Sequence, residues 1–172
     1  WGGREEGTVF VYGGKVPAYH AAFLNGMLCH ARELDDGHED GAIHSFSSVL
    51  PAALAVAEEK GNVSGKEFLV ALTLGVDLAV RLALSMRYLR GWHYTGFCGT
   101  LAAAAAAARI MGFDPDKMRQ TLGIAYTQTA GIAIGSTEAT MTKRLNPAIA
   151  SRSGVMSAYL AGDGVTGPNN IF

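Results

Sequence analysis

The sequence predicts an all-α fold, a multi-helix bundle built around a central alanine-rich helix. Apolar residues recur three and four positions apart over most of the chain, which is the spacing of amphipathic helices. Seven consecutive alanines, Ala102 to Ala108, combine the highest helix propensity with a surface that lets neighbouring helices approach closely. The only strand-like alternation is a weak run over 8–12, so we expect about six helices and no substantial sheet.

The first two helices are expected over 18–33 and 47–60. Pro17 suits the first turn of the first helix, because proline fixes a helical φ and lacks an amide donor that would be unsatisfied there. The polar segment 35–41 should form the connecting loop, and a serine should cap the second helix at its start. Gly61 is expected to end that helix.

Capping signals divide the middle of the chain. Ser64 and Glu67 have the spacing of a capping box, in which the two side chains satisfy each other's backbone amides. The helix that follows should end at Gly91, and 92–96 should be a short connector before the alanine-rich helix over 101–111.

The remaining residues predict two more helices. Asp114 and Pro115 should cap and open a helix that reaches about Ile134. A polar loop over 136–142 then leads to a last helix over 147–161, and glycines follow it.

Composition narrows the classes of function. The net charge is −1, with 49% hydrophobic and 17% charged residues, so we expect neither nucleic acid nor a membrane as a partner. The two cysteines, Cys29 and Cys98, lie in apolar helix-like surroundings without metal-binding spacing. They are expected to be reduced thiols, which favours a cytoplasmic location.

The densest polar cluster lies between the first two helices. It contains Glu33, Asp35, Asp36, His38, Glu39, Asp40 and His44. A solvated acidic loop is one interpretation. A metal site, as in metal-dependent helical hydrolases, is a second interpretation, and acid–base chemistry by a histidine beside a carboxylate is a third.

Two further groups are candidates for the same chemistry. His93 lies between two apolar helices, where it is either a capping histidine or a catalytic one. Lys143 and Arg144 precede the last helix and are either surface charges or groups that bind the carboxylates of an anionic substrate.

The order of these features resembles the MmgE/PrpD family. The segments that carry the resemblance are the aspartate-rich run 25–54, the S-G-K-E-F-L segment from Ser64, Gly91-Trp92-His93-Tyr94-Thr95, Lys143-Arg144-Leu145, and the exit 160–168. Family members include 2-methylcitrate dehydratase, cis-aconitate decarboxylase and iminodisuccinate epimerase. They have a large helical domain and a smaller α/β domain, and they usually dimerise. The resemblance therefore implies that residues 1–172 are part of a single helical domain, without the α/β domain.

The resemblance also implies site residues. His44, His93, Asp35 and Asp36 are the expected catalytic set. Lys143, Arg144, Glu33 and His38 are the expected substrate-binding set. Neither a metal nor another cofactor is expected. The chain departs from the family pattern at Glu33 and Gly37, where relatives commonly have Asp and Thr, and at Ser45 and Asn146.

We therefore predict a metal-independent lyase that acts on a small polycarboxylate and forms a homodimer. The specific prediction is dehydration of a 2-methylcitrate-like hydroxy acid, with Lys143 holding carboxylates and one of His44 and His93 removing a carbon-bound proton. Decarboxylation or epimerisation by the same kind of site remains open, as do a metal-dependent hydrolase and a catalytically silent binding module.

Overall fold

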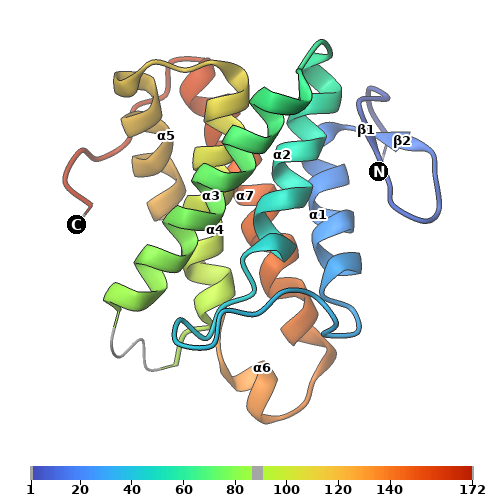
Figure 1. The fold of residues 1–172 in the computed structure, drawn as a ribbon, viewed down its shortest axis with the longest axis vertical. Coiled ribbons are helices and arrows are strands. Elements are labelled where there is room, and N and C mark those ends of the chain that lie inside the picture. Colours follow the sequence, from blue (N-terminus) through green and yellow to red (C-terminus); the bar gives the residue numbers. More distant parts are fainter. Residues whose placement is uncertain (1, 87–90, 172) are drawn as a thin grey trace.

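The structure, a computed structural model, describes residues 2–86 and 91–171 (Figure 1). The helices are α1 (Ala18–Cys29), α2 (Phe46–Lys60), α3 (Gly65–Ser85), α4 (Tyr94–Met111), α5 (Pro115–Thr127), the short α6 (Ile134–Thr137), the 3-10 helix η1 (Met141–Arg144) and α7 (Leu145–Gly162). Within the described residues the only sheet is the antiparallel pair β1 (Gly7–Thr8) and β2 (Lys15–Val16). The all-α prediction is confirmed.

The alanine-rich helix α4 forms the centre of the bundle, as predicted. It packs against α7, α3, α2 and α5, and every alanine from 102 to 108 is buried. The methyl side chains allow the neighbouring helix axes to come close, so that four helices can cover α4 on several sides. Cys98 on α4 is a buried free thiol whose pKa burial raises to about 12.

Two predicted caps are confirmed. The Ser64 hydroxyl accepts from the Glu67 amide, while the Glu67 carboxylate accepts from the Ser64 amide. At the start of α5, Asp114 accepts a hydrogen bond from the Lys117 amide, and Pro115 occupies the first turn. These local signals fix helix starts independently of the tertiary fold.

The end of the first helix and the start of the second differ from the prediction. The first helix ends at Cys29 rather than Glu33, and Glu33 itself has a φ of 54°, which no helix continues through. The second helix begins at Phe46, ahead of the two candidate capping serines. Its amides are capped by Asp36, a residue distant in sequence that single-residue capping rules do not consider.

Three further boundaries were wrong. The expected connector 92–96 is mostly the first turn of α4, where Thr95 is buried and its hydroxyl accepts from the His44 amide. Tertiary contact therefore overrides the low helix propensity of that turn. The fifth helix ends at Thr127 instead of about 134, because threonine hydroxyls bond to the last carbonyls and compete with helix continuation. The third helix was predicted to end at Gly91 but ends at Ser85. Residues 87–90 lie outside the described residues.

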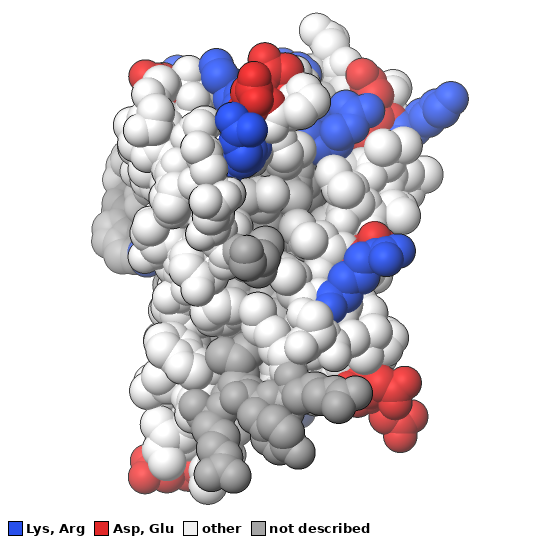
Figure 2. Space-filling model, turned by 90° about the vertical axis from the view of Figure 1, so that its left-hand side faces the viewer, with Lys and Arg blue, Asp and Glu red and all other residues white. Residues whose placement is uncertain are grey.

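One side of the bundle exposes apolar surface. Leu69, Val70 and Leu74 on α3 are exposed, and the side shown in Figure 2 carries few charged side chains in its middle. By length and composition α3 is the one described helix that could cross a membrane. Core helices of soluble proteins meet the same criterion, so this property alone assigns no membrane role.

The approach of α4 and α7 generates a stability prediction. A Cβ added at Gly154 would lie 2.5 Å from the Ala103 Cβ and 2.6 Å from the Ala104 amide nitrogen. The α4 backbone cannot move aside without disturbing the helix, so Gly154→Ala should lower the free energy of unfolding by about 1–3 kcal/mol. Gly65→Ala, also helical but with open space around the added Cβ, is the matched control for denaturant unfolding. Equal stability of the two variants would contradict the packing described.

Candidate active site

Three candidate side chains lie where helices begin, at one end of the bundle. Three segments meet at the lower end of Figure 1: the connector 30–45, residues 91–93 before α4, and residues 128–144. His44 precedes α2, His93 is the N-cap residue of α4, and Lys143 precedes α7. The backbone ties two of these segments together, because the His93 amide donates to the Gly131 carbonyl at 3.0 Å.

The connector between α1 and α2 is fixed by Asp36. Its carboxylate accepts from the Ser45 amide at 2.9 Å, the Ser45 hydroxyl at 2.8 Å and the Phe46 amide at 3.0 Å. A carboxylate at a helix N-terminus also interacts favourably with the helix dipole. The structure therefore gives Asp36, one of the predicted catalytic residues, a structural role in capping α2. The side chain holds the connector that carries His44.

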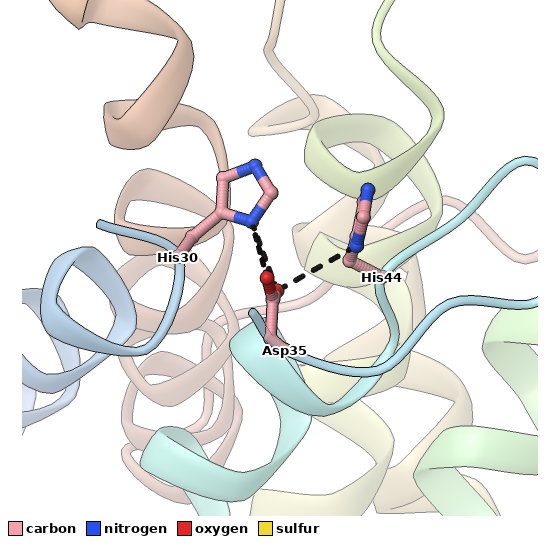
Figure 3. A group of neighbouring side chains, drawn as sticks. All are labelled: His30, Asp35 and His44. Atoms are coloured by element: carbon pink, nitrogen blue, oxygen red, sulfur yellow. Dashed lines mark hydrogen bonds and ion pairs between the residues drawn. The ribbon is translucent and has the colours of Figure 1, made fainter. Parts of the chain in front are cut away.

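Asp35 lies between two histidine rings (Figure 3). Its carboxylate oxygens are 2.9 and 3.1 Å from His30 Nδ1, and one of them is 3.7 Å from His44 Nδ1. Only a small part of Asp35 is exposed, and His30 is completely buried. Asp35 thus provides a negative charge directly beside the predicted catalytic histidine His44.

The hydrogen bonds assign the protons of both rings. Carboxylate and carbonyl oxygens only accept, so His30 Nδ1 donates to Asp35 and His44 Nδ1 donates to the Asp36 carbonyl at 2.7 Å. In the neutral form each Nε2 then carries the lone pair. Figure 3 shows both Nε2 atoms pointing away from Asp35 toward the same side. His44 Nε2 is therefore the nitrogen available to take a proton.

His93 faces the same cluster from α4. Its ring centroid lies 6.4 Å from that of His30, and its Nδ1 is buried with no hydrogen-bond partner among the described residues. Burial, followed by the nearby His30, Lys143 and His44 in that order, lowers the pKa of His93 to about 4. His93 is consequently neutral at pH 7.

A group of three charges borders the histidines. Glu33 bridges Lys143, at 2.6 Å from its Nζ, and Arg144, at 3.1 Å from a guanidinium nitrogen. The hydrogen bond from Lys143 holds the pKa of the Glu33 carboxyl below its usual value. Two cations share one carboxylate, so the group as a whole is positive. The structure thus brings together Glu33, Lys143 and Arg144 as predicted, with Glu33 positioned as their counter-ion.

His38 stands apart from this group. Its Nδ1 accepts a hydrogen bond from the Gly41 amide, and its backbone pairs with Ile43 in the turn before His44. This arrangement assigns it to the turn rather than to the cluster. The neighbouring Gly37 has no atom within 4 Å of an added Cβ, so the absence of a hydroxyl there has no steric cause.

Sequence reasoning missed His30. It is among the largest completely buried side chains and lies nearest to Asp35, yet it follows α1 in an apolar context that suggests a core position. Its spacing of five residues before Asp35 was the available signal. That spacing becomes meaningful only once the helix is known to end at Cys29.

His30, Asp35 and His44 could also be considered as metal ligands. Their potential ligand atoms lie within 4.8 Å of one another, and two imidazoles with a carboxylate can bind zinc or iron. However, both Nδ1 atoms that face Asp35 carry hydrogens, since one donates to Asp35 and the other to the Asp36 carbonyl. The geometry fits a hydrogen-bonded cluster better than a metal centre.

The fold and site together define a helical domain with histidines, a buried carboxylate and a cationic pair at one end. The family model for the MmgE/PrpD N-terminal domain matches residues 1–172, and the chain belongs to this family. This confirms the family resemblance seen in the sequence.

The curated relatives of the chain carry the name cis-aconitate decarboxylase or cis-aconitate decarboxylase-like protein. The chain is 39% identical to a cis-aconitate decarboxylase-like protein of Aspergillus oryzae, over 96% of the chain and 36% of that protein. It is 34% identical to a cis-aconitate decarboxylase of Aspergillus terreus, over 91% of the chain and 33% of the relative. A human cis-aconitate decarboxylase is 32% identical, over 91% of the chain and 34% of the relative. The chain thus spans about a third of the length of these relatives.

The low pKa of His93 generates a prediction about pH. The pKa lies near 4 in the folded state and near 6.5 when unfolded, so the unfolded state binds more protons between these values. His93 therefore makes folding less favourable as the pH falls from about 6.5 to about 4. The free energy of unfolding should decline less over this range in His93→Asn than in the unsubstituted protein. Parallel pH profiles would contradict the burial of this ring.

Proposed function

We propose that this chain provides the helical part of the active site of a lyase that decarboxylates a cis-aconitate-like polycarboxylate. One observation carries the proposal: basic histidine nitrogens and a positive lysine–arginine pair converge at one end of the bundle. The names of the relatives favour decarboxylation within the family.

The electrostatics of this end suit a multiply charged anion. Lys143 offers a compact charge and Arg144 a planar guanidinium that can bind a carboxylate through two hydrogen bonds. The N-termini of α2, α4 and α7 also lie at this end, and helix N-termini favour negative charge. Asp36 already caps α2, whereas the residues that begin α4 and α7 have no side-chain cap.

The histidines have the properties that proton transfer requires. His44 Nε2 carries a lone pair, and Asp35 stabilises the imidazolium that forms when that nitrogen takes a proton. His93 is neutral, so it too can accept a proton without first losing one. Which histidine acts first depends on how the substrate lies between them.

The proposed reaction breaks one carbon–carbon bond and makes one carbon–hydrogen bond. The bond to a carboxylate breaks and releases CO₂, and its electron pair delocalises toward a remaining carboxylate. Lys143 and Arg144 stabilise that developing charge. His44, protonated on Nε2 beside Asp35, then donates that proton to carbon, and the proton is restored from solvent.

Dehydration of a 2-methylcitrate-like acid is the second candidate, because the same groups could abstract a proton next to a carboxylate and protonate a leaving hydroxyl. It stays a prediction, as do epimerisation, the homodimer and the cytoplasmic location.

The natural full-length protein should be incubated in D₂O with cis-aconitate, 2-methylcitrate, citrate and an iminodisuccinate, each followed by NMR. We expect loss of CO₂ from cis-aconitate and deuterium in its product. Water loss from 2-methylcitrate would favour the second candidate. Turnover of none of these acids would overturn both and favour a silent binding module, and activity that requires added metal would favour a hydrolase.

His44→Ala and His93→Ala should each lower kcat by about 10²–10⁴-fold, the usual contribution of one proton-transfer group. His20→Ala, a substitution on α1 far along the chain from both histidines, is the control and should keep normal turnover. Near-normal kcat in both site variants would contradict the assigned roles.

A further inference from the structure

His30 is completely buried at the end of α1, yet it lies against the groups that the proposed chemistry uses. Its ring centroid is 4.8 Å from that of His44 and 6.4 Å from that of His93, each in an edge-on arrangement. Because the ring is not exposed, it does not itself present a surface to substrate. Any contribution to the reaction must therefore pass through its neighbours.

The strongest of these contacts is with Asp35. Both carboxylate oxygens lie within hydrogen-bond distance of His30 Nδ1, at 2.9 and 3.1 Å. One of the same oxygens faces His44 Nδ1 at 3.7 Å. Rotation of the Asp35 carboxylate would change both distances, so the His30 donor fixes where its negative charge lies relative to His44.

The other nitrogen of His30 argues against a purely packing role. Its Nε2 is buried without a hydrogen-bond partner among the described residues. A buried polar atom without a partner costs about 1–3 kcal/mol, so an apolar side chain of similar size would stabilise the fold better if packing were its only task. The Nδ1 hydrogen bond to Asp35 is the polar contact that an apolar side chain here would not make.

We propose that His30 is a positioning residue of this active site: its Nδ1 hydrogen bond orients Asp35 toward His44, and its ring sets the spacing of His44 and His93. The proposal rests on the proposed function, since it assigns His30 to the same proton-transfer site. Asp35 held in this way stabilises the positive charge of His44 during turnover, and a misplaced carboxylate stabilises it less.

Two substitutions separate the hydrogen bond from the bulk of the ring. His30→Asn keeps an N–H donor close to the position of Nδ1, whereas His30→Leu keeps apolar volume and removes the donor. In the natural full-length protein, His30→Leu should lower kcat by about 10²-fold, the effect expected of a misplaced catalytic group. KM should change little, because the interaction matters in the transition state. His30→Asn should recover most of the lost kcat.

His20→Leu is the matched control, a histidine substitution within α1, the helix that His30 follows, and it should leave kcat unchanged. Circular dichroism and unfolding temperatures must show that each variant is folded. Equal kcat in His30→Leu, His30→Asn and the unsubstituted protein would assign His30 to packing and overturn the proposal. A rise in KM without a fall in kcat would overturn it as well.

An NMR measurement on the unsubstituted protein tests the geometry without any turnover. In ¹⁵N-labelled protein, the His30 ring should carry its proton on Nδ1, and that proton should exchange slowly because the ring is buried. Asp35→Ala should accelerate the exchange. A proton found on Nε2, or exchange unaffected by Asp35→Ala, would overturn the proposal. If the panel of acids shows no turnover while this signal is present, the proposed function fails but the His30–Asp35 contact stands.

Discussion

The close contact between α4 and α7 is the constraint on which the rest of the structure depends. Both helices present glycine and alanine to each other, and at Gly154 even one added methyl group would collide with the α4 backbone. Small side chains bury little apolar area individually, so such an interface is stabilised by close packing over its whole length. It also fixes the axial position of the two helices, and with them the level at which each helix begins.

The position at which these helices begin determines which side chains meet at the site. Because α4 and α7 begin at the same end, the residues just before them, His93 and Lys143, are brought together, and the connector before α2 adds His44. Each side chain is attached to a helix terminus that the core holds in place. The site therefore combines a rigid support with polar groups that the apolar interior could not hold. Three helix N-termini at this end add an electrostatic preference for anions.

Charge within the site is arranged in two groups with different tasks. Glu33, Lys143 and Arg144 form a net positive group suited to carboxylates. His30, Asp35 and His44 form a second group suited to proton transfer, in which Asp35 accepts from His30 and lies 3.7 Å from His44. His93 lies near both and is kept neutral by burial and by its cationic neighbours. A polycarboxylate that bound to the first group would extend toward the basic nitrogens of the second.

How much of this follows from the sequence depends on whether the determining signal is local. The Ser64 cap acts within α3 and the alanine run within α4, so each signal is local, and both were predicted correctly. The start of α2 depends on Asp36, and the first turn of α4 on a contact with the His44 segment, so both were misplaced. The proximity of His44, His93 and Lys143 came from family resemblance, because no spacing rule brings residues about 50 apart together. His30 was missed, since a histidine in an apolar setting gives no sign of its partner until the end of α1 is known.

The central claim is that a polycarboxylate binds between the cationic pair and the two histidines. A crystal structure of the full-length protein with tricarballylate, a saturated tricarboxylate, tests it most directly. We expect one carboxylate on Lys143 or Arg144 and the carbon chain within reach of Nε2 of His44 or His93. Tricarballylate bound elsewhere, with Glu33 still bridging both cations and the histidines uncontacted, would contradict it.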